Sequence, residues 1–241
     1  MLEELYTVLS NTYYGILVIT AVVALFSLKK FKNSSTKYFC YFLVYVLCIE
    51  IIATYPKNLT QIEYFEWIKN TRFNNNFWFY TIFWTIGSSC FYSYYFQKIL
   101  KIKPFKLFLK YGRFLFLFVA ILLIILDFDK MFLSYYSTIE YFNTALIVFC
   151  VVFFFLEVLL TDTVLTFYNN INFYISATIL IWWFITIPLT IYSKYYNEND
   201  MDFVYLNRVI MACSNIFMYS CFAEIALATY SIKAILAKSD V

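Results

Sequence analysis

Long apolar segments alternate with short polar segments along the chain, and most of the charged residues fall in the polar ones. A helix needs about 20 apolar residues to cross the hydrocarbon core of a bilayer. The pattern therefore predicts an all-α fold, a polytopic transmembrane helix bundle. It has about seven spans, at residues 13–28, 38–55, 75–96, 114–126, 142–160, 173–192 and 203–230.

The composition agrees with a chain that lies mostly within a lipid bilayer. Of its 241 residues, 63% are hydrophobic and 14% are charged, whereas a soluble domain is about 25% charged. Seven spans take up roughly 140 residues, which leaves no single loop long enough for a separate domain. We therefore expect one transmembrane domain over residues 1–241. Because no Lys or Arg precedes the first span, we do not expect that span to be a cleaved signal peptide.

The distribution of basic residues predicts the orientation of the chain. Twelve of the 18 Lys and Arg residues fall on one side of the predicted membrane, and the side richer in Lys and Arg is cytoplasmic as a rule. This places the N-terminus outside and the C-terminus in the cytoplasm, in the inner (plasma) membrane of the cell. The longest inner loop is predicted to be a basic amphipathic segment on the inner leaflet, and its charges form an inner basic surface of Lys98, Lys101, Lys103, Lys106, Lys110 and Arg113.

Several kinds of chemistry are disfavoured by residues that the chain lacks. It contains no histidine, which removes His-based metal sites and His-dependent nucleophilic catalysis. Its six cysteines fall inside predicted spans without metal-ligand spacing, so we expect them to be buried and reduced. No phosphate-binding loop appears, and the last span lacks the lysine that retinal needs. We expect no enzyme activity, cofactor, metal or nucleic-acid partner.

Three glutamates interrupt the predicted spans, namely Glu50, Glu157 and Glu224. An acidic side chain at the centre of a membrane helix costs about 2.5 kcal/mol or more. Each glutamate is therefore expected to face the bundle interior or to be protonated. Glu157 and Glu224 fall in the inner halves of their spans and can share a site, whereas Glu50 falls in an outer half. Asp162 follows near the inner interface.

These acidic residues have two interpretations. They can form a proton or cation site, or a polar hinge between helices, with Lys110 and Arg113 as candidate partners on the inner side. Alternatively, they are structural and bond to hydroxyl groups of neighbouring helices. Ser89 and Ser93 give the third span a small polar patch together with Ser88 and Cys90, and such patches typically pack or hydrogen-bond helices together.

Three aromatic-rich segments carry a resemblance to a group of known proteins. These are residues 73–80 (FNNNFWFY), 172–175 (NFYI) and 215–219 (NIFMY). They are similar to segments of small multi-helix integral membrane proteins of Bacteroidota, whose helices resemble the membrane-sensor regions of some histidine kinases. The resemblance covers most of the chain and implies a sensor-like membrane protein, but no functional residue is carried over from it. Because only residues 231–241 follow Tyr230, we expect no kinase domain here.

The leading functional hypothesis is a non-enzymatic membrane protein that acts as a sensor, relay or accessory subunit. Its partners would be the lipid bilayer and another protein or a second copy of the chain. The alternative is an oligomeric protein that conducts ions or protons, or a membrane-disrupting effector, in which Glu157 and Glu224 carry the activity. A lipid-modifying enzyme ranks last because the chain has no histidine.

Overall fold

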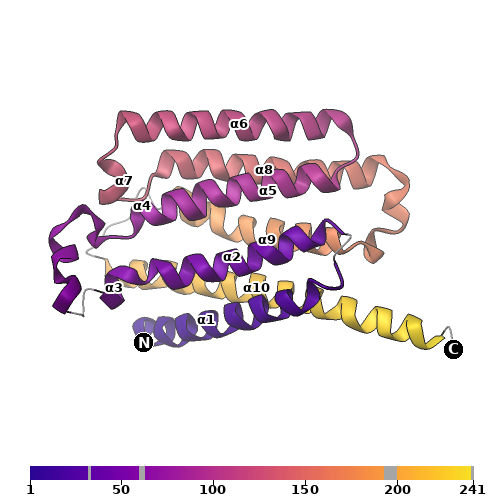
Figure 1. The fold of residues 1–241 in the computed structure, drawn as a ribbon, viewed down its shortest axis with the longest axis horizontal. Coiled ribbons are helices and arrows are strands. Elements are labelled where there is room, and N and C mark those ends of the chain that lie inside the picture. The colour runs from indigo at the N-terminus through magenta and orange to yellow at the C-terminus, as the bar shows by residue number, and fades with distance from the viewer. Residues whose placement is uncertain (32–33, 60–62, 193–199, 240–241) are drawn as a thin grey trace. The chain divides into compact units, whose positions relative to one another are not determined.

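The computed structural model describes residues 1–31, 34–59, 63–192 and 200–239. Within these ranges the regular elements are all helical (Figure 1), which confirms the predicted all-α fold. The α-helices are α1 (Leu2–Ser27), α2 (Thr36–Ala53), α3 (Tyr55–Leu59), α4 (Phe77–Phe79), α5 (Gly87–Ile99), α6 (Lys103–Leu126), α7 (Lys130–Leu133), α8 (Ser137–Leu160), α9 (Ile171–Tyr192) and α10 (Met201–Ser239). Short 3-10 helices are η1 (Glu63–Asn70), η2 (Arg72–Asn74), η4 (Asp162–Leu165) and η5 (Phe167–Asn169), and η3 (Tyr80–Ile86) is a π-helix.

Within the described residues, six helices are long and apolar enough to cross a membrane, namely α1, α2, α6, α8, α9 and α10. The chain is therefore a multi-pass helical membrane protein. The remaining expected span corresponds to a helical run that continues from Phe77 to Ile99 through α4, η3 and α5. The π-helix divides this run, so that none of its three parts reaches the length of a span by itself.

The helix α6 begins earlier than the pattern of apolar residues indicates. We expected a separate segment on the leaflet from Lys98 to Arg113, followed by a short span. Instead, the residues between α5 and α6 are only 100–102, and α6 continues without a break from Lys103 to Leu126. Proline is favoured in the first turn of a helix, and Pro104 stands there. The basic side chains of residues 103–113 therefore belong to the first turns of a long membrane helix.

The helices group into two compact units, and the single transmembrane domain expected over residues 1–241 stays a prediction. The first unit comprises residues 1–44 and 162–241, and the second comprises residues 45–161. The boundaries fall within α2 and directly after α8.

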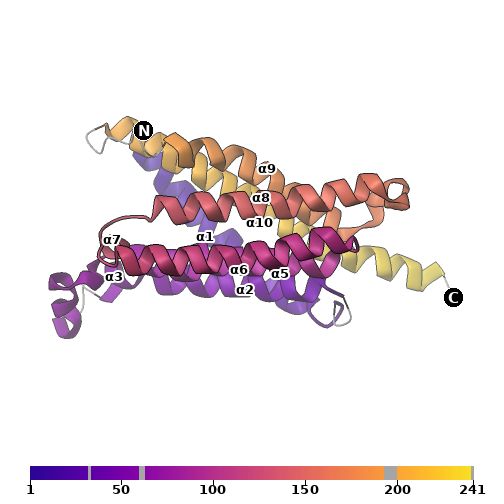
Figure 2. The ribbon, with the colours of Figure 1, turned by 90° about the horizontal axis from the view of Figure 1, so that it is seen from above.

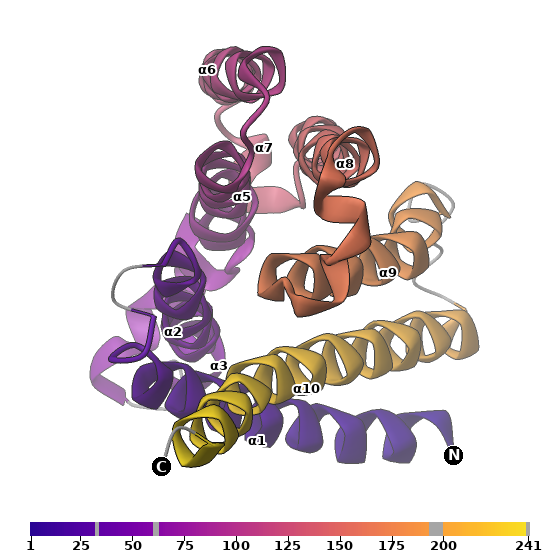
Figure 3. The same ribbon diagram turned by 90° about the vertical axis from the view of Figure 1, so that its right-hand side faces the viewer.

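In the first unit, α1 packs along α10 (Figure 3) and α10 packs against α9. Two hydroxyl groups of α1 bond to carbonyls of α10: Thr20 Oγ1 donates to Tyr219 O at 3.0 Å, and Ser27 Oγ donates to Ala226 O at 3.4 Å. Helices α9 and α10 are joined by a bond of 2.9 Å from Trp182 Nε1 to Asn215 Oδ1. Such polar contacts between helices are typical of membrane bundles, where apolar side chains gain little by leaving lipid.

In the second unit, α5, α6 and α8 contact one another, and α6 runs beside α8 in Figure 2. Aromatic rings fill part of the α6–α8 contact, with Phe105 stacked on Phe153 at a centroid distance of 4.8 Å. The outward face of α6 is apolar, with exposed Phe114, Phe118 and Ile121. That face is suited to contact with lipid chains.

The six cysteines are free, but their burial differs from the expectation. Cys40 and Cys150 are buried, and Cys90 and Cys221 are half-buried. Cys48 and Cys213 are exposed, because they lie on the outward faces of α2 and α10. In a membrane protein such faces contact lipid, so an apolar thiol is tolerated there.

Candidate functional site

The buried glutamate of α8 is held by backbone amides rather than by other side chains. Glu157 is 7% exposed. The N–H of Lys101 donates to both of its carboxylate oxygens at 2.8 Å, and the N–H of Ile102 donates to Oε2 at 2.7 Å. Glu157 therefore binds α8 to the three-residue connection between α5 and α6.

The start of α6 explains why a carboxylate is needed there. The first N–H groups of a helix lack partners within the helix, and a polar N-cap side chain commonly supplies one. The N-cap of α6 is Ile102, which has no side-chain acceptor, and the first turn contains no acidic residue. Lys103 instead adds positive charge where the helix dipole is already positive. Glu157 accepts from the N–H groups of the N-cap residue Ile102 and of Lys101 before it, and it places a compensating negative charge at this end of the helix.

This arrangement corrects the expected partners of Glu157. Among the described residues, no ion pair joins Glu157 to Lys110 or Arg113. These two basic residues lie at least two turns into α6, whereas the carboxylate lies at the N-terminal end of that helix. The backbone amides of residues 101 and 102 take the place of the basic side chains.

The other acidic candidates lie in different surroundings. Glu50 is half-buried, and its Oε2 accepts a hydrogen bond of 3.0 Å from the Tyr80 hydroxyl. Glu224 is exposed on α10, and Asp162 is exposed at the start of η4. Glu157 belongs to the second unit and Glu224 to the first, so a site shared by these two residues stays a prediction.

A second cluster of polar contacts surrounds the π-helix. Tyr45 on α2 donates its hydroxyl to Phe83 O in η3 at 2.6 Å. The same hydroxyl lies over Gly87, where an added Cβ would come within 2.5 Å of it. The tyrosine therefore reaches the backbone only because residue 87 has no side chain. π-Helices are often found at functional sites.

The small polar patch of the third expected span lies inside the second unit. Ser89 and Ser93 are fully buried, and Ser89 donates a short hydrogen bond to Asn143 Oδ1 on α8. Buried Thr85, Ser89 and Ser93 follow one another at intervals of four residues, so these small side chains lie along one face of the helical run. This face lets α5 approach α8 closely and gives the contact a buried polar bond.

The N-terminal end of the helical run from Phe77 to Ile99 is joined to the residues that precede it. The single proton of the Tyr55 hydroxyl is shared between Phe73 O at 2.7 Å and Asn75 O at 3.0 Å, and the oxygen accepts a bond of 2.9 Å from Trp78 Nε1. A phenol is protonated at neutral pH, so the Tyr55 hydroxyl is a hydrogen-bond donor there. We call this part of the second unit the Tyr55 end, and the part around residues 100–102 the Glu157 end.

Two further contacts support the Tyr55 end. Asn76 Nδ2 donates to Ala53 O at 2.8 Å, which provides a partner for a carbonyl at the end of α2. Arg72 forms an ion pair with Asp129, although both side chains are largely exposed. An exposed pair of this kind contributes at most about 1 kcal/mol, so the Tyr55 and Asn76 bonds are the main polar constraints.

The inner basic surface lies at the Glu157 end. The exposed residues are Lys98, Lys101, Lys103 and Lys110, whereas Lys106 and Arg113 are half-exposed. Apolar side chains stand between them, with exposed Leu107 and Phe108 on the same turns. The surface thus combines positive charge with apolar contact area, which suits an acidic protein segment or an anionic membrane surface.

Several of these residues could not be selected from the sequence. Tyr45, Tyr55 and Asn143 look like ordinary members of a chain with 24 tyrosines and many asparagines. The one available signal was Gly87, since the chain has only three glycines and glycine is costly within a helix. Within the described residues, no group of three or more acidic or cysteine side chains could hold a metal ion. Comparisons with known protein families, curated proteins and solved structures found no match.

Proposed function

We propose that this protein is a non-enzymatic sensor or relay, or an accessory subunit, that acts on a protein partner through its inner basic surface. The observation that carries the proposal is the bonding at both ends of the second unit. Tyr55 accepts a bond from Trp78 in the helical run from Phe77 to Ile99 and donates to Phe73 O in the preceding segment. Glu157 joins the connection after the other end of the run to α8. A displacement at the Tyr55 end would therefore be transmitted along the run to the basic surface.

The proposal includes a topology. The helical run from Phe77 to Ile99 is a span in addition to the six long helices, so the chain crosses the plasma membrane seven times. The excess of Lys and Arg places the Glu157 end in the cytoplasm, the Tyr55 end outside and the N-terminus outside. In this orientation the Tyr55 end meets external signals, and the basic surface meets a cytoplasmic partner or the cytoplasmic part of a second copy.

A photocrosslinking experiment in the native host tests the proposed partner. A photoreactive amino acid at Leu107 stands among the basic residues, whereas one at Ile125 stands on the apolar part of the same helix. We expect Leu107 to yield one discrete crosslinked protein, and Ile125 to yield only lipid adducts. The crosslink should be lost when Lys103→Glu and Lys110→Glu are combined, because complementary charge guides and orients such contacts.

The mass of the crosslinked product identifies the partner. A product that contains only this chain shows that the partner is a second copy, and a product with another chain shows a heteromeric complex. If Leu107 gives only lipid adducts, as Ile125 does, the basic surface merely contacts the bilayer and the proposal is wrong.

A further inference from the structure

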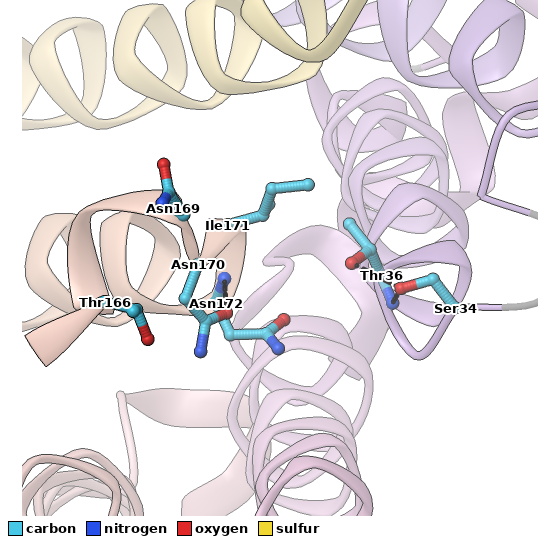
Figure 4. A pocket seen from close by; sticks show the side chains of 7 residues that line it. All are labelled: Ser34, Thr36, Thr166, Asn169, Asn170, Ile171 and Asn172. Carbon is cyan, nitrogen blue, oxygen red and sulfur yellow. Dashed lines mark hydrogen bonds between the residues drawn. The ribbon is translucent and has the colours of Figure 1, made fainter. Parts of the chain in front are cut away.

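The first unit contains a polar pocket, open to the surface, where two membrane helices begin; we call it the cavity. It has a volume of about 350 Å³, which falls in the range of about 300–1,000 Å³ that is usual for ligand pockets. Ser34 and Thr36 line one side, at the start of α2 (Figure 4). Thr166, Asn169, Asn170 and Asn172 line the other side, around the start of α9.

The lining has a distinctive chemistry because none of the described residues that line the cavity is charged. Its polar groups are hydroxyls and carboxamides, and both kinds of group donate as well as accept hydrogen bonds. An anion or cation would find no opposite charge among these described residues to compensate its loss of water. A neutral ligand with several hydroxyl groups would match the wall, since hydroxyls also donate and accept.

Part of the wall is held in place without a ligand. Ser34 Oγ and Thr36 Oγ1 are 3.0 Å apart and hydrogen-bonded, and Thr36 is buried. On the other side, Asn170 Oδ1 accepts the N–H of Asn172 at 3.0 Å. That bond fixes the Asn170 carboxamide, so its Nδ2 group is oriented before any ligand arrives. Fixed polar groups lower the entropy cost of binding.

The position of the cavity suggests where such a ligand comes from. Helices α2 and α9 are both candidate membrane spans, and the cavity lies at the first residues of each. The end of a span lies near the level of the lipid headgroups. We propose that this cavity binds a neutral, hydroxyl-rich group of the glycosyl or polyol class, either as a lipid headgroup or as a soluble sugar. This inference rests on the first unit alone and is independent of the relay function.

Native mass spectrometry of the whole protein in detergent tests the inference. The probes are monoglucosyl diacylglycerol and diacylglycerol with the same acyl chains, so that the two lipids differ only in the sugar. We expect the glucosyl lipid to be retained about 25-fold more strongly, because each of two hydrogen bonds contributes about fivefold. Methyl glucoside added in solution distinguishes the sources. Displacement of the lipid shows that the cavity also accepts a free sugar, and retention shows that the acyl chains are needed as well.

Two exposed residues of the wall allow a test that does not disturb folding. Thr166 and Asn169 are exposed, so Thr166→Val combined with Asn169→Ala should leave the melting temperature unchanged. We expect this double variant to lower retention of the glucosyl lipid at least fivefold. Asn70→Ala is the matched control, since Asn70 is an exposed asparagine of the second unit. Equal retention of the two lipids by the parent, or equal retention of the glucosyl lipid by parent and double variant, would overturn the inference.

Discussion

Gly87→Ala is expected to destabilise the protein by about 1–3 kcal/mol, the usual cost of overfilling a packed site. The new Cβ would come within 2.5 Å of the Tyr45 hydroxyl, so the tyrosine must move and lose its bond to Phe83 O. In an ordinary exposed helix the same change would stabilise by up to about 1 kcal/mol. Thermal unfolding in detergent, followed by intrinsic tryptophan fluorescence, measures the difference.

The Tyr45 hydroxyl can be removed to test the cause of that effect. Tyr45→Phe should cost about 1 kcal/mol by loss of one hydrogen bond. In the Tyr45→Phe protein, Gly87→Ala should cost little, because the nearest remaining atom of residue 45 is the ring carbon Cζ at 3.4 Å. Gly15→Ala is the matched control, since a Cβ there meets nothing within 4 Å. If Gly87→Ala is equally harmful with and without the hydroxyl, the contact with Tyr45 is not its cause.

Glu157→Ala is the second substitution with a large expected effect, and it should lower the free energy of unfolding by about 3 kcal/mol. The substitution leaves the N–H groups of Lys101 and Ile102 without the carboxylate that they bind. Hydrogen bonds to charged groups contribute about 1.5–3 kcal/mol each, and donors left without partners add to the cost. The melting temperature should fall by roughly 6–12 °C.

Glu157→Gln separates this structural role from ion conduction. The glutamine Oε1 still accepts an N–H bond, so we expect the variant to lose less than half of the stability that Glu157→Ala loses. Glu224→Gln is the matched control on an exposed site and should leave stability unchanged. A proton flux into proteoliposomes that Glu157→Gln abolishes, with folding unchanged, would instead support the conducting hypothesis.

The helices were predictable because a membrane span requires a long apolar segment, and such segments are visible in the sequence. The start of α6 was not predictable from local residues. Its N-terminus depends on Glu157, which lies 55 residues after Ile102, and a local pattern carries no information about such a contact. The π-helix was likewise hidden, because residues 80–86 are apolar whichever helix type they adopt.

The candidate site was predictable in its residue types but not in its contacts. The cost of an acid in a membrane drew attention to Glu50 and Glu157, and the structure gives both of them hydrogen-bond partners. The sequence pointed to Lys110 and Arg113 as partners because opposite charges attract, whereas two backbone amides hold the carboxylate. Tyr45 and Tyr55 went unnoticed because their importance comes from carbonyl groups that they meet only in the folded chain.

The central claim is that the Tyr55 end and the Glu157 end of the second unit are mechanically linked. Hydrogen exchange at the amides of Lys101 and Ile102, measured by mass spectrometry in nanodiscs, tests it most directly. Tyr55→Phe removes the bonds to Phe73 O and Asn75 O and the bond from Trp78 Nε1, and it should speed exchange at these two amides by up to about fivefold. Asn215→Ala breaks a comparable bond in the first unit and should leave them unchanged. Faster exchange at residues 73–78 of Tyr55→Phe, with no change at residues 101 and 102, would contradict the account.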